Sequence, residues 1–547
     1  MRRPTFLGLV LGLALLCASF SPSLLPRHWV FQGIVSGLVL TAGYGLGTLA
    51  SHLWRSLPTP EPSRRVKRVA WPVLAGAGAG GVAVTWWMGA MAQLRLHRMM
   101  GMEAPQVSAY LLSLPLAAII AVVLVVLGRG IRLSARRIAR ILGRWLPPRV
   151  AGILGGLVVG AVLIGLADGF IVDRFFAAAD ETFRVTDRVI PDDATQPASP
   201  LRSGSPASLV AWEDLGSKGR TFVSGALTRD ELARFSDTAQ EPIRVYAGLD
   251  TAETIQGRVD VALRELERTG AFQRDVLCVM TATGTGWIDP QAAAALEYIW
   301  AGDSALVSVQ YSYLPSWISF LVDSVRAREA GAELFNRVYE EWASLPEGTR
   351  PLLLVFGESL GADGSEAAFS GVADLRNRTD GVMWVGPPNF SRLWSRFVDD
   401  RNPGSLERLP NYQDGETVRF AGSLDDLQGM EEPWPPPRVL YLQHASDPVV
   451  WWSPRLILRR PDWLTEPGAG YVLESVRWYP LVTFLQLTVD LANSIRVPPG
   501  HGHNYASLLA DGWAGVASPP GWTAADTRQL RRLLVDQAES ERSSWSG

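Results

Sequence analysis

Acidic residues are nearly missing from the first third of this 547-residue chain. Only Glu61 and Glu103 precede Asp168, the first aspartate, although the whole chain carries 54 acidic residues against 51 basic ones. Lysine is also scarce, because Lys67 and Lys218 are the only two. The formal charge of −3 excludes a global field that would draw the protein to nucleic acid, so we expect no nucleic-acid partner.

Cysteine and histidine are also scarce, which limits the available covalent and metal chemistry. The two cysteines, Cys17 and Cys278, lie in apolar runs, so no disulfide framework is predicted. The six histidines form no Cys/His cluster, which argues against a structural zinc site. Two of these histidines stand in the sequence Gly-His-Gly-His at 500–503.

Long apolar runs, in contrast, fill the N-terminal third. Each reaches or approaches the roughly 20 residues that a helix needs to cross a bilayer. The first run follows Arg2 and Arg3, as in a signal peptide, but it ends without a clear small-x-small cleavage site, and we interpret it as a retained helix. We predict an all-α transmembrane domain over residues 1–178 with about five spans, at 5–25, 30–53, 69–93, 107–128 and 150–172.

Basic residues gather in every second loop between these runs. Under the positive-inside rule those loops are cytoplasmic, so the N-terminus is expected inside and everything after about residue 172 extracytoplasmic. The richest stretch, 129–149, alternates arginines with apolar residues and is expected to lie on an anionic membrane surface. Membrane lipids are therefore predicted partners.

Residues 179–212 are interpreted as a linker, since 190–210 is rich in Pro, Ser and Asp. From 213 to 547 strand-like and helix-like stretches alternate, which is typical of a mostly parallel sheet flanked by crossover helices. The expected strands lie within 243–249, 275–287, 305–314, 352–358, 381–387 and 438–448.

One of these strands runs into Gly-Glu-Ser-Leu-Gly at 357–361. Gly-x-Ser-x-Gly on a strand–turn–helix junction is typical of a nucleophile elbow, in which small flanking residues permit a strained turn. Ser359 is therefore the predicted nucleophile. The alternative is an ordinary strand-to-helix connection that happens to contain a serine.

A serine nucleophile needs a base, and the base needs an orienting acid, in the order Ser, acid, His. Of the downstream histidines, His444 lies within a strand-like run, so we favour His503, with His501 as the alternative base. Asp447, in a turn fixed by the proline after it, is the predicted acid, and Asp490 is the weaker rival.

An ester oxyanion needs two backbone N–H donors. Leu360, directly after the nucleophile, is expected to supply one, and Gly284 or Thr285 in the glycine-rich turn TATGTGW the other. That turn lacks the Gly-Lys-Ser/Thr ending of a phosphate-binding loop, which excludes this competing interpretation.

The stretches TATGTGWIDP, QYSYLPSW, GESLGADGSEAAF, LQHASDPVVWWSP and GHGHNY span most of residues 215–510. With these motifs the chain resembles the α/β-hydrolases, and more narrowly a bacterial membrane-anchored group in which a multi-helix N-terminal domain precedes the hydrolase. The resemblance implies a Ser–His–Asp hydrolase that uses neither a metal nor an organic cofactor. It supplies no substrate.

Two segments, about 388–437 and 455–497, are expected to cap the site of this α/β-hydrolase domain. Four tryptophans, Trp451, Trp452, Trp463 and Trp478, either build an apolar pocket wall or pack as ordinary core aromatics. An apolar opening beside a bilayer suits ester or lipid-like substrates with acyl chains.

We therefore predict a membrane-anchored serine hydrolase that cleaves carboxylic, lipid or acyl esters through an acyl-enzyme. One alternative is a transacylase that moves the acyl group to a hydroxyl of the cell envelope. Another is a non-catalytic membrane assembly or binding protein with a degenerate hydrolase domain. The sequence indicates no oligomeric state.

Overall fold

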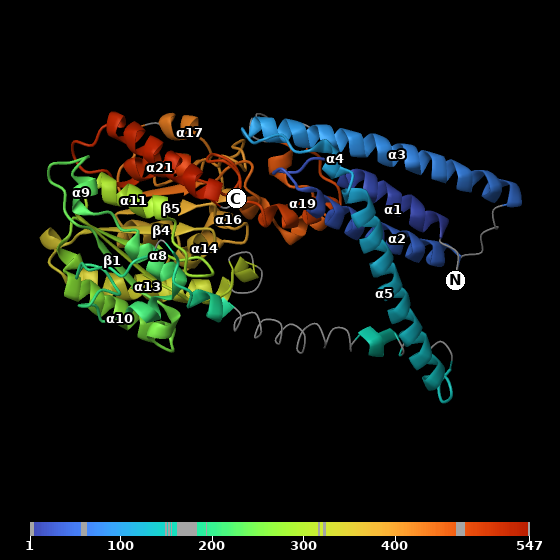
Figure 1. The fold of residues 1–547 in the computed structure, drawn as a ribbon, viewed down its shortest axis with the longest axis horizontal. Coiled ribbons are helices and arrows are strands. Elements are labelled where there is room, and N and C mark those ends of the chain that lie inside the picture. Colours follow the sequence, from blue (N-terminus) through green and yellow to red (C-terminus); the bar gives the residue numbers. More distant parts are fainter. Residues whose placement is uncertain are drawn as a thin grey trace. The chain divides into compact units, whose positions relative to one another are not determined.

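The computed structural model describes residues 5–55, 63–147, 150, 154, 156–160, 183–192, 194–315, 318–320, 324–430, 432–466 and 476–544. The chain forms two compact units, and Figure 1 labels some of their elements. The first unit comprises Met1–Ala179, Pro454–Leu464 and Leu473–Asp490, and the second comprises Asp180–Ser453, Thr465–Val472 and Leu491–Gly547. Both units therefore combine segments that are far apart in the sequence.

The first unit is helical. Its elements are α1 (Phe6–Ser19), α2 (Trp29–Trp54), α3 (Arg64–Met99), α4 (Val107–Tyr110), α5 (Ser113–Leu142), the 3₁₀ turns η7 (Pro454–Ile457) and η8 (Asp462–Leu464), and most of α19 (Val482–Leu491). Within the described residues, three helices are long and apolar enough to cross a membrane, namely Trp29–Trp54, Arg65–Met99 and Val107–Leu142.

Of the five predicted spans, those at 30–53, 69–93 and 107–128 are confirmed as helices of this kind, and the first, at 5–25, is wrong. Helix α1 has only 14 residues, because the chain turns after Ser19 into a proline-containing loop at 20–28 that cannot continue the helix. The fifth predicted run, 150–172, lies largely outside the described residues. The basic stretch expected at 129–149 begins as the second half of α5, which is continuous from Ser113 to Leu142.

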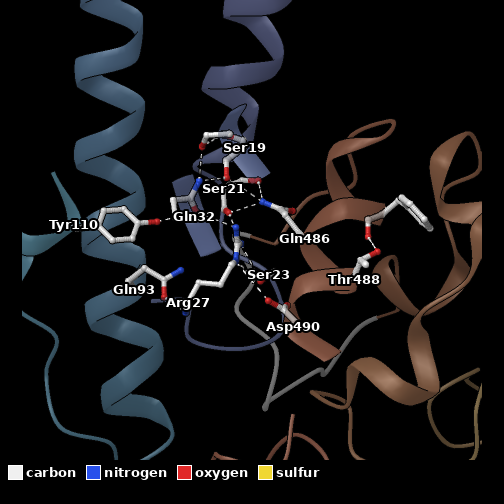
Figure 2. A network of polar contacts seen from close by, with 12 residues as sticks. Ser19, Ser21, Ser23, Arg27, Gln32, Gln93, Tyr110, Gln486, Thr488 and Asp490 are labelled. Atoms are coloured by element: carbon white, nitrogen blue, oxygen red, sulfur yellow. Dashed lines mark hydrogen bonds and ion pairs between the residues drawn. The ribbon is translucent and has the colours of Figure 1, made fainter. Parts of the chain in front are cut away.

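Helix α19 packs against the N-terminal helices rather than standing alone as a lid. Val482 shares a buried cluster with Val35 and Val39 of α2. The polar side of the same helix is also engaged, because Gln486 Nε2 donates to the carbonyl oxygen of Ser21 at 2.9 Å (Figure 2). The second segment expected to cap the site, 455–497, is thus divided between the two units.

A buried polar network at the end of α1 holds α19 (Figure 2). The Arg27 guanidinium lies 3.5 Å from Asp490 Oδ1, and both side chains are at most 1% exposed. Arg27 Nη1 donates to Gln32 Oε1 at 2.9 Å, and the Tyr110 hydroxyl donates to the same oxygen at 2.8 Å. The Gln93 side chain accepts the Arg27 backbone N–H at 2.8 Å. The network thus connects α2, α3, α4 and α19.

The second unit is built on a seven-stranded sheet in the order β1-β3-β2-β4-β5-β7-β6, with every described pair parallel. The strands are β1 (Ile243–Ala247), β2 (Val276–Thr281), β3 (Ser304–Val309), β4 (Leu352–Glu358), β5 (Gly381–Val385), β6 (Val418–Ala421) and β7 (Arg438–Leu442). Six of these strands were expected. The edge strand β6 was not, because it has four residues inside a segment expected as a cap.

Helices cover both faces of this sheet, as Figure 1 shows. One layer contains α8 (Gly216–Ser224), α10 (Ile255–Thr269), α13 (Ser324–Ser344) and α14 (Leu360–Glu366). The other contains α11 (Pro290–Ile299), α17 (Leu424–Gln428), α20 (Ala506–Ala517) and α21 (Ala524–Ser544). Short helices α9 (Arg229–Leu232), α15 (Val372–Arg378), α16 (Arg392–Asp399) and α18 (Pro448–Trp451) lie in the connections, together with 3₁₀ turns. The predicted parallel sheet with flanking helices is confirmed.

We expect Asp490→Ala to lower the free energy of unfolding by about 3–5 kcal/mol, because it leaves the buried Arg27 without its counter-charge. Denaturant unfolding of the full chain in detergent measures this loss. The double change Arg27→Met with Asp490→Leu should recover most of it, since apolar residues can replace a buried pair. The matched control is Asp260→Ala at the exposed pair with Arg337, which should cost about 1 kcal/mol or less. Equal losses at both sites would contradict the prediction.

Candidate active site

Ser359 lies at the point where the central strand β4 ends and α14 begins. Its backbone has φ 54° and ψ −124°, a sparsely populated conformation for a residue with a side chain. The Ser359 N–H donates to the carbonyl oxygen of Val385 in the neighbouring strand β5 at 2.9 Å. This strained turn is fixed from both sides, by the strand before it and by the helix after it.

The two glycines that flank the serine are required by close packing. A Cβ on Gly357 would lie 2.5 Å from the carbonyl carbon of Gly361, and a Cβ on Gly361 would overlap the carbonyl oxygen of Thr281 at the end of β2. Side chains at either position would push α14 away from the sheet. The spacing Gly-x-Ser-x-Gly is therefore a steric consequence of the sharp turn.

Asp447 accepts three hydrogen bonds and is fully buried. Its Oδ2 accepts the Nδ1–H of His503 at 2.6 Å and the hydroxyl of Tyr505 at 2.8 Å, while Oδ1 accepts the backbone N–H of Val449 at 2.8 Å. A carboxylate only accepts hydrogen bonds, so the His503 proton resides on Nδ1 and the lone pair on Nε2.

The structure brings His503, and not His501, to Asp447. The His503 backbone N–H donates to the carbonyl oxygen of Ser494 at 2.8 Å, which fixes the loop that carries the imidazole. Its Nε2 makes no hydrogen bond within the described part of the chain, to Ser359 included, although both side chains line one cavity.

The other two histidines downstream of Ser359 have different surroundings. His501 is half-buried, and burial lowers its pKa. Burial also lowers the pKa of His444 to about 4, and its ring stacks on Tyr505 with centroids 4.0 Å apart. His444 is therefore a neutral packing residue in the described structure. Asp490, the rival acid, belongs to the other unit, where it faces Arg27.

Ser359 and His503 open into a cavity of about 390 Å³ at the carboxyl ends of the strands. One part of its lining is polar and comes from the turn after β2 and its neighbours, namely Lys218, Thr283, Thr285, Asp289, Gln291 and Glu358. Another part is apolar, namely Pro315, Phe320, Val449, Leu491, Ala492 and Ile495. None of the four tryptophans considered as a pocket wall is among the described lining residues, whereas Trp287 is.

The residues predicted to form an oxyanion hole divide between the cavity and the core. Leu360 is the first residue of α14, where backbone N–H groups have no acceptor within the helix. Thr285 lines the cavity. Gly284 instead packs so closely on Ser319 and Leu314 that an added Cβ would overlap them.

Sequence reasoning missed two further acidic residues of the same cavity, Glu358 and Asp289. Glu358 Oε1 lies 3.6 Å from His503 Nε2, on the side of the imidazole opposite Asp447. Burial, and then the negative charge of Asp289, raise the pKa of Glu358 well above its usual value. Burial also raises the pKa of Asp289, whose Oδ1 accepts the Ala292 N–H at 2.7 Å as the N-cap of α11. The available signals were the Glu before the nucleophile and the Asp-Pro that starts the helix.

Gly386 at the end of β5 was also missed. It has φ +51°, and a Cβ there would lie 2.6 Å from His503 Nδ1 and 2.9 Å from Asp447 Oδ2. The His–Asp contact therefore requires glycine at this position. Among the described residues, no group of three or more His, Cys, Asp or Glu is arranged to hold a metal ion.

A parallel sheet with helices on both faces, a strained serine after its central strand and a cavity at the strand ends together define a hydrolase-type fold. Residues 243–530 match the alpha/beta-hydrolase family, and residues 20–226 match the N-terminal region of an alpha/beta-hydrolase family. Because the first match covers more than half of the chain, the protein belongs to the alpha/beta-hydrolase family, as its motifs indicated. No curated protein and no solved structure matches the chain.

Gly386→Ala should destabilise the protein by several kcal/mol, because the new methyl group overlaps the His503–Asp447 pair and the backbone keeps a positive φ. The matched control is Gly404→Ala, which also has a positive φ but nothing within 4 Å of its Cβ, and should cost only about 1 kcal/mol. Thermal unfolding of both variants checks the difference. Indistinguishable melting curves would show that space around Gly386 is not limiting.

Proposed function

We propose that this protein is a membrane-anchored serine hydrolase that cleaves carboxylic esters. The observation that carries the proposal is the shared cavity, into which a serine on a strained turn opens beside an imidazole whose Nδ1 binds a buried carboxylate. That arrangement supplies a nucleophile, a base and an orienting acid. Membership of the alpha/beta-hydrolase family supports the same reaction class.

The reaction follows from the positions of these groups. Ser359 Oγ attacks the ester carbonyl carbon while His503 Nε2 takes the hydroxyl proton, and Asp447 holds the resulting imidazolium. The carbonyl oxygen becomes an oxyanion, for which the N–H of Leu360 is one donor and that of Thr285 the second candidate. Collapse breaks the ester C–O bond, and His503 returns its proton to the leaving alcohol. Water, activated by the same imidazole, then releases the acid and regenerates the serine.

The apolar part of the cavity favours an acyl chain as the acid portion of the substrate. Phe320, Val449, Leu491 and Ile495 supply this surface, and an acyl chain gains about 0.8 kcal/mol for each buried CH₂ group. Three apolar helices are consistent with anchoring in a membrane, where such esters are found. A lipid or other acyl ester is therefore the proposed substrate class.

A fluorophosphonate, which traps active serines covalently, should label the full chain, and Ser359→Ala should abolish the labelling. His503→Ala and Asp447→Asn should each reduce the labelling rate by about 10³-fold or more, because the serine loses its base or the base loses its orienting acid. In-gel fluorescence over time measures these rates.

His501→Ala is the matched control for the base, because it changes a neighbouring histidine of the same loop and should keep near-normal labelling. Labelling that depends on His501 instead would reverse the assignment of the base. Failure of the folded wild-type protein to react would favour a non-catalytic binding role.

We further propose that the second unit is extracytoplasmic, because the basic half of α5 and the other basic loops favour the cytoplasmic side, and the apolar run at 150–172 is expected from the sequence to cross the membrane once more. A protease added to intact cells should then cleave within the second unit, whereas inverted membrane vesicles should protect it. Immunoblotting with an antibody against the C-terminal helix reads out both cases. Protection in intact cells with cleavage in inverted vesicles would establish the opposite orientation.

A further inference from the structure

The imidazole of His503 lies between two carboxyl groups. Asp447 binds Nδ1 at 2.6 Å, and Glu358 Oε1 lies 3.6 Å from Nε2, the nitrogen that has to exchange protons with Ser359 and the leaving group. Glu358 is 3% exposed and stands directly before the nucleophile. An ionised carboxylate in this place would compete with the reaction for the proton on Nε2.

Asp289 offers a way to keep Glu358 neutral. Both side chains are buried and both line the cavity, and the negative charge of Asp289 acts on Glu358. Two buried carboxylates side by side repel each other, so the pair favours a state in which one of them carries a proton. Asp289 is the favoured anion, because the backbone N–H of Ala292 donates to it and the N-terminus of α11 stabilises negative charge.

We propose, on the basis of the serine hydrolase function inferred above, that Glu358 and Asp289 share a proton beside His503 and so set the upper pH limit of the reaction. With the proton on Glu358, the oxygen that faces Nε2 is neutral. The imidazolium formed during attack then remains acidic enough to protonate the leaving alcohol. Glu358 is thus a positioning residue that acts through His503.

Loss of the shared proton changes the electrostatics in two ways that both slow the reaction. The new charge on Glu358 stabilises the imidazolium, so less of the neutral base is present at a given pH. The same charge repels the oxyanion that develops on the substrate. Because burial and the charge of Asp289 raise the pKa of Glu358, its proton is lost at a higher pH than that of an ordinary glutamate. Activity should therefore fall on the alkaline side.

The other titratable or charged groups around Glu358 come from four elements. They are Asp289 before α11, Asp447 after β7, His503 and Tyr505 before α20, and Lys218 of α8, which lines the same cavity. Burial raises the pKa of Tyr505 well above its usual value, and its hydroxyl donates to Asp447. Asp447 is unchanged in every variant described below. A change on the alkaline side of the pH profile of activity (its alkaline limb) therefore reports on Glu358 and Asp289.

The test is the pH dependence of kcat/KM for a short-chain ester, measured on the full chain in detergent from about pH 5 to 10. Glu358→Gln should remove the alkaline limb, because an amide cannot lose this proton. Asp289→Asn should move the limb to lower pH, because the charge that helps Glu358 to retain its proton is gone, while Asn can still cap α11. The fall should reach about tenfold or more, since a nearby charge shifts a pKa by about 1–3 units.

Glu366→Gln is the matched control. Glu366 is another buried acid on the helix after Ser359, and burial raises its pKa to about 8, but it binds Tyr441 and Leu393 and does not line the cavity. Glu366→Gln should leave the alkaline limb of the kcat/KM profile unchanged. Circular dichroism at each pH distinguishes titration from unfolding.

Three results would overturn the inference: a Glu358→Gln profile that overlays the wild type, a limb that moves with Glu366→Gln, or no limb in either the wild type or Asp289→Asn. Failure of the proposed function is distinguishable, because the wild-type protein would then show no esterase activity at any pH.

Discussion

The close approach of α14 to the ends of β2 and β4 is the constraint on which the second unit's cavity depends. Gly361 sits against the carbonyl oxygen of Thr281, and Gly357 against Gly361, so the helix can begin immediately after the strand. That contact holds Ser359 in a backbone conformation that would otherwise be unfavourable. It also places Glu358, the last residue of β4, beside the same cavity, which is why an acid and a candidate nucleophile are direct neighbours there.

Asp447 is the second fixed point, and three segments depend on it. It caps α18 through Val449, accepts from His503 and accepts from Tyr505, whose hydroxyl in turn accepts the His444 N–H at 2.9 Å. Each donor limits the freedom of the carboxylate, and Gly386 leaves no other side chain in its space. A buried carboxylate with this many donors stays in one orientation. Asp447 therefore fixes the orientation of the His503 imidazole through Nδ1, while Nε2 faces the cavity and Glu358.

Much of this arrangement follows from local sequence patterns, and the remainder depends on tertiary contacts. Six buried strands were recognisable as apolar runs bounded by turns, and Ser359, Asp447 and His503 were recognisable because each follows a strand or lies in a polar loop. The edge strand β6 has too few residues to show the alternation of apolar and polar residues that marks a strand. Gly386 carries no local signal for its surroundings, and the Asp-Pro at 289–290 indicates only the start of a helix, because what matters is which side chains the fold brings near these residues. The first predicted span was wrong because the apolar length of a stretch alone does not separate a membrane helix from a short helix such as α1.

The placement of α19 changes how the two family matches are understood. Residues 243–530 match as one alpha/beta-hydrolase region, yet α19, which lies inside that range, packs on α2 and is held by the buried Arg27–Asp490 pair of the N-terminal unit. The core of the N-terminal helices therefore includes a helix from the hydrolase sequence. After Asp490 the chain continues into Leu491 and Ala492, which line the cavity, and then into Ser494, whose carbonyl oxygen holds the His503 loop. The segment that carries the His503 imidazole therefore begins directly after α19, the helix that packs among the N-terminal helices.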